Sequence, residues 1–246
     1  MNPDPISKID PEKVRNRYNQ IGTIWAQNDK WHQYTHERIS QFLSKFFLKR
    51  PTRDRKLLNA GSGGNAWGLE NIDQLHVDIA ERKINHLPNS LVSSIESMPV
   101  GPAMFDYCLC VGSVINYCDA AATIHELHRV IKTGGYLIIE FESSRTFEFI
   151  FSSTFGKSAT IAETFYQESP EIIWVYSESY ITRLLQNSGF KIHSADRFHV
   201  LSPAVYRIVK NSNFASKFTV LDTISRKIPF LKWFAANVIL SCEKIL

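Results

Sequence analysis

A glycine-rich turn and a nearby carboxylate are the residues whose types and spacing point most directly to chemistry. Residues 57–68, LLNAGSGGNAWG, run from an apolar stretch into a series of small side chains. Gly61 and Gly63 permit a tight turn, so backbone N–H groups at the carboxyl end of a parallel strand stay open to a nucleotide-like ligand. Asp78 ends the next apolar run and is placed to accept hydrogen bonds from both hydroxyl groups of a ribose. The pattern therefore predicts a nucleotide-type cofactor site.

Two other interpretations fit single parts of this pattern. Gly61, Gly63 and Ala66 satisfy the dinucleotide pattern GxGxxA, which indicates an NAD(P) site. However, only twelve residues separate Ala66 from Asp78, where ~20 are typical, and Gly68 interrupts the helix that should follow the glycines. The first crossover helix is therefore expected to be stunted. The carboxylate of Asp78 could instead cap a helix that begins at the following AERKI.

The elements that must position these residues follow from hydrophobic periodicity. Short apolar runs typical of strands occur at 56–60, 74–80, 90–95, 105–112, 136–141, 190–198 and 236–245. Helical patterns at 119–132 and 177–188 separate some of them, and we expect Gly134 and Gly135 to end the first helix. Strands that alternate with helices form parallel βαβ units covered on both faces. The sequence thus predicts an α/β fold, a three-layer sandwich around a mostly parallel sheet.

Three segments lie outside this alternation. Residues 1–53 carry two helical patterns and are predicted to form an N-terminal helical cap, followed by the main domain at 54–246. Within that domain, residues 144–176 are rich in aromatic side chains and irregular in pattern. We expect them to form a lid over the substrate or an ordinary packed subdomain. Residues 199–234 are basic and helical, and form a second insertion before the last strand.

Composition and charge exclude several classes of protein. The chain has 246 residues, of which 44% are hydrophobic and 21% charged, so disordered and low-complexity structure is excluded. Its net charge of +4 is too mild for a protein dedicated to nucleic-acid binding. The excess is uneven, because residues 200–246 carry seven basic side chains and two acidic ones. This tail predicts contact with an anionic surface or an acidic substrate, or else a solvated helical face.

Cysteine and hydropathy patterns indicate where the protein works. The four cysteines form no CxxC pair and have no histidine at zinc-binding spacing, so no metal site is expected. His32 and His36 lie one helical turn apart, so they could serve as bases or bind a metal, although the sequence offers no further ligands beside them. The polar N-terminus does not read as a signal peptide, and the apolar run at 230–242 is far shorter than the ~20 residues of a membrane-spanning helix. We therefore expect a cytoplasmic protein with reduced thiols.

In combination, the motifs resemble those of the class I S-adenosylmethionine-dependent methyltransferases. LLNAGSGGN (57–65) resembles the first motif of that family, VDIA (77–80) its acidic motif, and SIESMPV (94–100) its segment beside the adenine. FDYCLCVGSVINY (105–117) is similar to the fourth strand of the family, and HELHRVIKTGGYLIIE (125–140) to the helix and fifth strand that follow. The resemblance implies a Rossmann-like fold of seven strands, the last one antiparallel, and S-adenosyl-L-methionine as cofactor.

The resemblance also implies roles for individual residues. The cofactor-binding residues would be Tyr18, Asn59, Gly61, Ser62, Gly63, Asp78, Ile79, Ile95, Glu96, Val111 and Gly112. The glycine turn would approach the methionine part, Asp78 would hold the ribose, and Tyr18 would fold over the cofactor. A packing role for Tyr18 and a solvated loop position for Glu96 are the alternatives. The family usually has an acidic residue where this chain has Asn59, which leaves open a protein that binds the cofactor without turnover.

The implied chemistry depends mainly on alignment, because the sulfonium methyl group is already an electrophile. A hydroxyl nucleophile also needs a base that titrates near neutrality. Glu142 is the predicted base and Asn116 a second catalytic candidate, with Glu140 and Tyr117 close by, although Glu142 could also be a solvated carboxylate at a strand end. The expected reaction is methyl transfer to oxygen or nitrogen of a small-molecule or glycan-type acceptor. The alternatives are an NAD(P)-linked oxidoreductase and a non-catalytic S-adenosylmethionine-binding protein.

Overall fold

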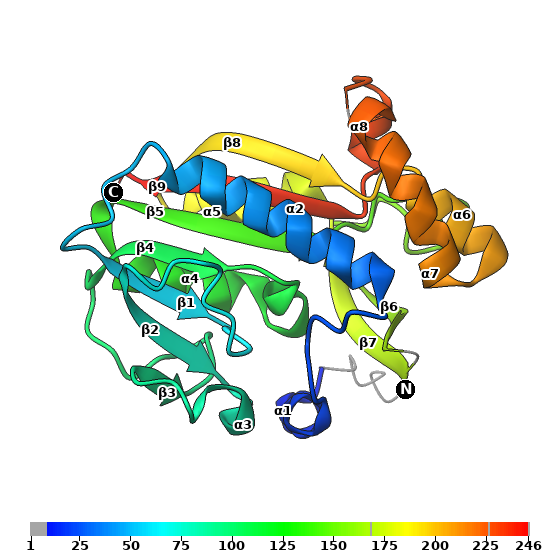
Figure 1. Cartoon of the computed structure of the whole chain (residues 1–246). Helices are drawn as coiled ribbons and strands as arrows, with labels where there is room; N and C mark the ends of the chain where they lie inside the picture. Colours follow the sequence, from blue (N-terminus) through cyan, green and yellow to red (C-terminus); the bar gives the residue numbers. More distant parts are fainter. Residues whose placement is uncertain (1–8, 168, 226, 246) are drawn as a thin grey trace, which may run out of the picture.

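A seven-stranded sheet forms the centre of the molecule. The computed structural model describes residues 9–167, 169–225 and 227–245. The strand order is β3 (Ser90–Val92), β2 (Asp73–Asp78), β1 (Lys56–Ala60), β4 (Phe105–Cys110), β5 (Ile131–Glu142), β9 (Asn237–Lys244) and β8 (Phe190–Phe198). All pairs are parallel except those of β9, which is antiparallel to both β5 and β8 (Figure 1). The predicted α/β fold with an antiparallel last strand is confirmed.

One face of the sheet is covered by α2 (Lys30–Phe47), which crosses it in Figure 1. The helix begins where the Asp29 carboxylate accepts a hydrogen bond from the His32 N–H at 3.1 Å, which satisfies a backbone donor of its first turn. Its apolar stripe, which includes Ile39 and Leu43, packs on side chains of the central strands such as Leu109. This helix, expected within a cap, is thus one of the covering layers of the sheet.

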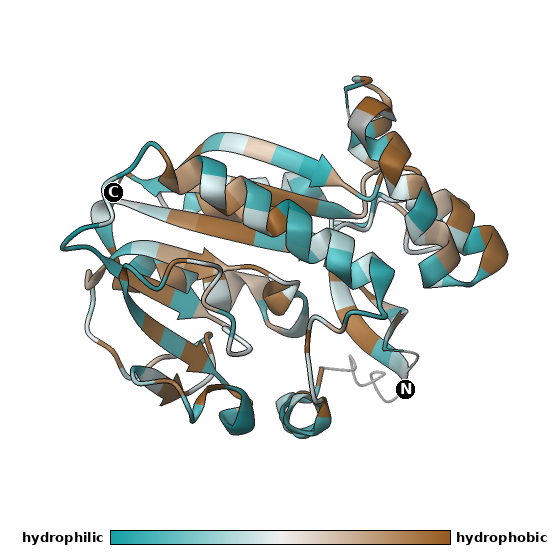
Figure 2. Ribbon diagram, viewed as in Figure 1, coloured by the Kyte–Doolittle hydropathy of each residue, from teal (hydrophilic) through white to brown (hydrophobic). Residues whose placement is uncertain are grey.

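The opposite face is covered by α4 (Ala120–Val130) and α5 (Glu178–Asn187). Strand β4 is buried along its whole length because it is enclosed from both sides. Cys108 and Cys110 contribute to the core beneath α4 and α5, whereas Tyr107 and Leu109 contribute to the core beneath α2. Figure 2 shows hydrophobic residues concentrated along the central strands. The predicted three-layer sandwich is therefore present.

The glycine pair after α4 has a different role from the predicted one. The helix ends at Val130, because Ile131 adopts extended backbone and pairs with Phe105 as the start of β5. Gly134 and Gly135 lie inside β5, where its register against β4 shifts. A Cβ atom on Gly135 would lie 2.9 Å from the carbonyl oxygen of Asp106. The expectation that these glycines end the helix was wrong, and they accommodate a bulge in the strand.

The N-terminal helix α1 runs from Pro11 to Gln20. Apolar and aromatic residues recur at near-helical spacing from Val14 as far as Trp25 and predict a longer helix, but Ile21 already adopts extended backbone. The helix lies beside the short α3 (Glu81–Ile84), whose Arg82 N–H donates to Asn19 Oδ1 at 3.0 Å. This contact places α1 near the carboxyl ends of the parallel strands (Figure 1). Residues 1–8 of the predicted cap lie outside the described residues.

The aromatic segment at 144–176 contains a β-hairpin that the sequence analysis did not predict. After a short 3-10 helix η2 (Phe147–Phe149), β6 (Ala159–Tyr166) and β7 (Ser169–Tyr176) pair in antiparallel register. The pair forms a separate two-stranded sheet that projects beyond the carboxyl edge of the central one (Figure 1). Strands β6 and β7 are thus regular structure in a segment that was expected to be irregular.

The segment before the last strand is built from short helices. They are α6 (Ser202–Val209), α7 (Ser212–Ala215), η3 (Ser216–Leu221), α8 (Asp222–Ser225) and η4 (Leu231–Phe234), with η1 (Val114–Tyr117) an earlier short 3-10 helix after β4. In Figure 1 this group stands at the end of the sheet and extends away from it. In the part of the chain that the structure describes, no helix is both long and apolar enough to cross a membrane.

Candidate active site

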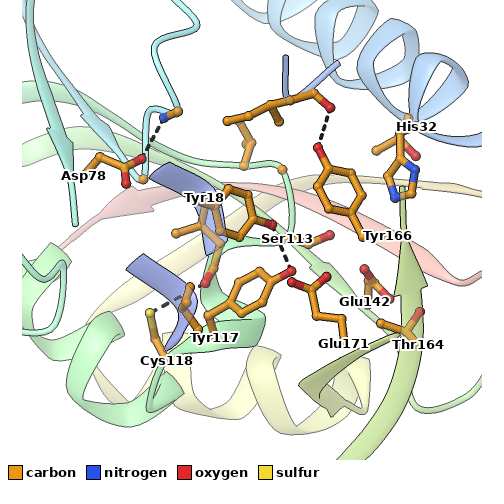
Figure 3. Close-up of a pocket in the computed structure, with 18 of the residues that line it drawn as sticks. Tyr18, His32, Asp78, Ser113, Tyr117, Cys118, Glu142, Thr164, Tyr166 and Glu171 are labelled. Carbon is orange, nitrogen blue, oxygen red and sulfur yellow. Dashed lines mark hydrogen bonds between the residues drawn. The ribbon is translucent and has the colours of Figure 1, made fainter. Parts of the chain in front are cut away.

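The carboxyl ends of the parallel strands open into one cavity of about 1600 Å³, its mouth included. One side is formed by the glycine turn after β1, the end of β2 and the loop after β4. The other side comes from α1, the β6–β7 hairpin and α6. Figure 3 shows Tyr18 of α1 and Tyr166 and Glu171 of the hairpin facing the same space. In open α/β sheets this edge is where ligands bind, because the loops there leave a crevice between strands. The cavity is therefore the candidate active site.

The glycine turn is held rigidly against the next strand. The N–H groups of Gly61 and Ser62 both donate to the carbonyl oxygen of Val77, at 2.8 and 3.0 Å. Gly61 has a φ of +72°, and a Cβ atom there would lie 2.2 Å from a methyl carbon of Val114. Only glycine fits this close approach between the turn and η1. Residues 61–72 form turns without a helix, so the predicted stunting of the first crossover is confirmed.

Asp78 is bound directly to the glycine turn. Its Oδ2 accepts the Gly63 N–H at 2.7 Å and its Oδ1 accepts the Ala80 N–H at 2.8 Å. Ala80 is the residue that precedes α3, and no side chain caps that helix. Burial raises the pKa of the Asp78 carboxyl group, although these backbone hydrogen bonds oppose the shift. Asp78 therefore couples the turn to β2 within the cavity wall, where each carboxylate oxygen has a second lone pair for a ligand.

The predicted cofactor residues lie together, with one exception. Ten of the eleven line the cavity, namely Tyr18, Gly61, Ser62, Gly63, Asp78, Ile79, Ile95, Glu96, Val111 and Gly112. Asn59 does not line it, since its buried side chain donates from Nδ2 to the Asn65 carbonyl oxygen at 2.8 Å. Asn59 thus shapes the glycine turn from behind. The Glu96 carboxylate accepts the Asp119 N–H at 2.5 Å and so also holds the start of α4.

Side chains from α1 and the hairpin meet over the cavity. Arg17 donates to the carbonyl oxygens of Tyr166 and Pro170, each at 2.9 Å. The Tyr18 hydroxyl donates to the Tyr117 hydroxyl at 3.0 Å, and its ring stacks on Tyr166 at 6.1 Å between centroids (Figure 3). Burial raises the pKa of both Tyr18 and Tyr117, so both phenols are neutral at physiological pH. These contacts close the cavity between segments that are far apart in the sequence.

Two of the residues considered for catalysis position the backbone around the cavity. Glu140 is fully buried and accepts hydrogen bonds from the N–H groups of Gly112 and Ser113 and from Asn237 Nδ2, at 3.0, 2.7 and 2.8 Å. Asn116 is also fully buried, and its amide bonds the backbone of Glu142 and the Trp174 carbonyl oxygen. Asn116 lies outside the cavity lining. It therefore joins β5 to β7 instead of facing a ligand.

Three glutamates line the acceptor side of the cavity. Burial is the largest cause that raises the pKa of Glu142 to about 8 and that of Glu148 to about 7. The pKa of Glu171 is also raised by burial, while Arg17, 3.3 Å from its carboxylate, opposes the shift. Glu140, Glu148 and Glu171 add negative charge around Glu142 and raise its pKa further. Two carboxyl groups that titrate near neutrality at one cavity are candidates for acid–base chemistry.

His32 reaches the same part of the cavity from α2. Its Nδ1 lies 2.7 Å from Asp29 Oδ2, so Nε2 is the ring nitrogen through which it could act as a base. Its ring also meets Tyr166 edge-on (Figure 3). His36 does not line the cavity and stacks on Trp67, 5.1 Å away. Among residues 9–167, 169–225 and 227–245, no cluster of three histidine, cysteine or acidic side chains is arranged to hold a metal ion.

The residues that sequence reasoning missed come mainly from the hairpin and η2. Glu148, Tyr166 and Glu171 line the cavity although no recognised motif contains them. A weak signal exists in β7, where Glu171, Ile173 and Val175 are buried alternately with more exposed residues, as expected for a half-covered strand. This alternation predicts the strand, but local sequence does not reveal that the strand reaches the cavity.

Comparison with known proteins agrees with this geometry. Residues 57–139, from β1 into β5, match the model of a methyltransferase domain. No curated protein matches the chain. The fold resembles that of 1,6-didemethyltoxoflavin-N1-methyltransferase from Burkholderia thailandensis, crystallised with 1,6-didemethyltoxoflavin and S-adenosylhomocysteine, with a TM-score of 0.58 and 13% identity over 98% of this chain and 92% of that one.

Two further solved structures share the fold. Geranyl diphosphate C-methyltransferase from Streptomyces coelicolor, in complex with Mg²⁺, geranyl diphosphate and S-adenosyl-L-homocysteine, has a TM-score of 0.57 and 11% identity, covering 95% of this chain and 97% of that one. A methyltransferase from Archaeoglobus fulgidus has a TM-score of 0.54 and 14% identity, covering 85% and 94%. The chain thus has the fold and strand order of the class I S-adenosylmethionine-dependent methyltransferases, and its residues 57–139 match a methyltransferase domain.

Proposed function

We propose that this protein transfers the methyl group of S-adenosyl-L-methionine to an oxygen or nitrogen atom of a small-molecule or glycan-type acceptor. The observation that carries the proposal is the joining of two compartments in one cavity. The rigid glycine turn and Asp78 form one compartment, and Glu142, Glu148 and Glu171 line the other. Because one continuous cavity is lined by both sets of residues, a cofactor and an acceptor bound in it would lie side by side.

The cofactor is proposed to lie along the ends of β1, β2 and β4. Asp78 would accept hydrogen bonds from the ribose hydroxyl groups, since its oxygens face the same compartment as the turn. Ile79 and Ile95 supply apolar surface for the adenine, and Gly112 lets the backbone approach the sulfonium. Gly112 has a φ of +87°, and Trp25 is the nearest side chain to the space where its Cβ atom would lie. Glu140 holds this part of the loop by accepting the Gly112 and Ser113 N–H groups.

The proposed reaction needs alignment and one proton acceptor. A lone pair of the acceptor atom attacks the methyl carbon, the carbon–sulfur bond breaks, and its electron pair stays on sulfur to give the neutral thioether. The acceptor atom then carries a proton that must leave, and we assign that proton to the Glu142 carboxylate. Its pKa of about 8 suits a group that accepts a proton near neutral pH and later releases it.

The size and lining of the second compartment support a small acceptor. α1 and the hairpin are joined above it by Arg17, Tyr18 and Tyr166, which limits the compartment to a compact ligand. Carboxylates, phenols and His32 provide hydrogen-bond partners for hydroxyl or amine groups. The Burkholderia and Streptomyces enzymes named above were both crystallised with small molecules. A nucleic acid is not the proposed partner.

Transfer of labelled methyl groups tests this proposal. The purified chain is incubated with S-adenosylmethionine carrying a radiolabelled methyl group and with a cell extract divided into small-molecule, glycan, nucleic-acid and protein fractions. We expect label in the small-molecule or glycan fraction, bonded to oxygen or nitrogen. A chain that binds S-adenosylhomocysteine but labels no fraction would instead be a non-catalytic binding protein. Label confined to nucleic acid would contradict the proposed acceptor class.

A further inference from the structure

The short helices before the last strand expose an unusual amount of apolar surface. Of sixteen large hydrophobic side chains exposed among the described residues, nine belong to residues 208–233, which are about a tenth of the chain. They are Ile208, Val209, Phe214, Val220, Leu221, Ile224, Ile228, Phe230 and Trp233. The exposed fraction is 83% for Ile208, 70% for Val220 and 68% for Phe230. Apolar surface concentrated in this way marks an interaction site.

This surface is placed where a large partner can reach it. In Figure 1, α6, α7 and α8 stand apart from the sheet at one end of the molecule, and Figure 2 shows hydrophobic residues along them. The helices between residues 202 and 234 are short, since α7, η3, α8 and η4 each have six residues or fewer, and they leave many of their apolar side chains exposed. We call the exposed apolar and basic side chains of residues 202–234 the terminal patch.

The terminal patch carries positive charge that the protein does not neutralise. Lys210, Lys217 and Lys227 are exposed and Lys232 is partly exposed, and none of the four forms an ion pair within the described part of the chain. The only acidic residue between 202 and 234 is Asp222, which is buried. Its carboxylate accepts the Val200 N–H at 3.0 Å and a hydrogen bond from Tyr34. The patch therefore combines exposed aliphatic and aromatic groups with unpaired cations.

Aromatic side chains lie next to these lysines. Lys217 Nζ lies 5.6 Å from the ring centre of Phe214, and Lys232 Nζ lies 5.4 Å from that of Trp233. Lysines beside tryptophan and phenylalanine suit the boundary between acyl chains and headgroups. The methylene groups of each lysine can lie in the apolar region while its ammonium group stays in water. The pattern matches a surface that lies on a bilayer.

The same segment borders the candidate active site. Tyr206 and Ser212 line the cavity, and Arg207 donates to the Glu148 carbonyl oxygen at 2.8 Å, which ties α6 to η2. A surface bound through the terminal patch would therefore lie beside the acceptor compartment. From this placement and charge we propose that the terminal patch docks the protein on an anionic lipid bilayer, next to the mouth of its cavity.

Charge complementarity favours a bilayer over a second copy of this chain. In a two-fold dimer the same patch faces itself, so the lysines of one copy would meet those of the other. An anionic bilayer offers both an apolar interior and negative headgroups. The cytoplasmic leaflet of a membrane, which a cytoplasmic protein would meet, contains anionic lipids. Each lysine is expected to strengthen such binding about fivefold at moderate salt.

Co-sedimentation with vesicles tests the docking proposal. The purified full chain is mixed with vesicles of phosphatidylcholine alone, or of phosphatidylcholine with an equal part of phosphatidylglycerol. We expect binding to the mixed vesicles to be at least ~tenfold stronger and to weaken as salt is raised. Ile208→Asp and Phe230→Asp should each lower binding about tenfold, and Lys217→Ala about fivefold on the anionic vesicles.

Leu48→Asp is the matched control, because Leu48 is also 83% exposed but lies at the other end of α2 from the patch. It should bind vesicles like the wild type. Affinity for S-adenosylhomocysteine, measured for every variant, separates a loss of docking from a loss of folding. Equal binding to both vesicle types, or an equal effect of Leu48→Asp, would overturn the proposal. A dimer in sedimentation equilibrium that Ile208→Asp dissociates would assign the patch to a second copy instead.

Discussion

Replacing Asp78 by alanine is expected to weaken binding of S-adenosylhomocysteine tenfold or more, about 1.4 kcal/mol. The carboxylate lies at the end of β2, and its two oxygens accept hydrogen bonds from the Gly63 and Ala80 N–H groups. Its removal deletes the proposed acceptor for the ribose hydroxyl groups and loosens the glycine turn. Both effects act on the cofactor and not on the acceptor. Titration calorimetry with S-adenosylhomocysteine measures the change directly.

Asp73→Ala provides the comparison for this variant. Asp73 begins the same strand but is exposed, and its carboxylate accepts a long, 3.4 Å hydrogen bond from Asn89. Its replacement should leave the affinity within twofold of the wild type. Circular dichroism shows whether each variant keeps its fold. Unchanged affinity in a folded Asp78→Ala protein would remove the ribose assignment.

Replacing Glu142 by glutamine is expected to lower kcat/KM for the acceptor by about a hundredfold near neutral pH, the lower range of general-base catalysis. The base works only in its ionised form. With a pKa of about 8, Glu142 is mostly protonated at pH 7, so kcat/KM of the wild type should rise with pH and level off above pH 8. The glutamine variant cannot ionise and should lose this rise. The pH profile distinguishes the base from a residue that only shapes the cavity.

Affinity for the cofactor separates this effect from a general loss of the site. Glu142→Gln should bind S-adenosylhomocysteine like the wild type, because the side chain faces the acceptor compartment (Figure 3). His32 is the other base that lines this compartment, with Asp29 on its Nδ1. A Glu142→Gln protein that retains the pH-dependent rise, together with a His32→Gln protein that lacks it, would move the role to His32.

The cofactor side of the molecule could be predicted from the sequence because its signals are local. A strand, a turn that needs positive φ at Gly61 and a carboxylate at the end of the next strand follow one another along the chain. Parallel pairing of β1 with β2 then places Asp78 beside the turn without further information. This pairing accounts for the glycine turn and Asp78, whereas Tyr18, Ile95, Glu96, Val111 and Gly112 were predicted from the family resemblance; ten of the eleven predicted residues line the cavity. Asn59 is the exception, since its position on the strand was predictable but the direction of its side chain was not.

The acceptor side could not be predicted in the same way, because long-range packing decides it. Glu171 reaches the cavity because the hairpin packs against α1, where Arg17 donates to the Tyr166 and Pro170 carbonyl oxygens. Glu148 reaches it from η2, which Arg207 ties to α6. The sequence shows aromatic enrichment in this segment but not its pairing. The predicted role of Gly134 and Gly135 failed for a related reason. Two glycines that follow a helix commonly end it. Here the helix ends earlier, because Ile131 begins β5 and pairs with Phe105 of β4.

A calorimetric comparison distinguishes a cavity built for S-adenosylmethionine from one built for a dinucleotide. The unmodified chain is titrated with S-adenosylhomocysteine and, separately, with NADH and NADPH. The missing helix between β1 and β2 and the insertion of β9 beside β5 both set this fold apart from a dinucleotide-binding one. We expect one S-adenosylhomocysteine molecule to bind per chain, with no heat of binding from either dinucleotide. Binding of NADH or NADPH without binding of S-adenosylhomocysteine would assign the cavity to a dinucleotide instead.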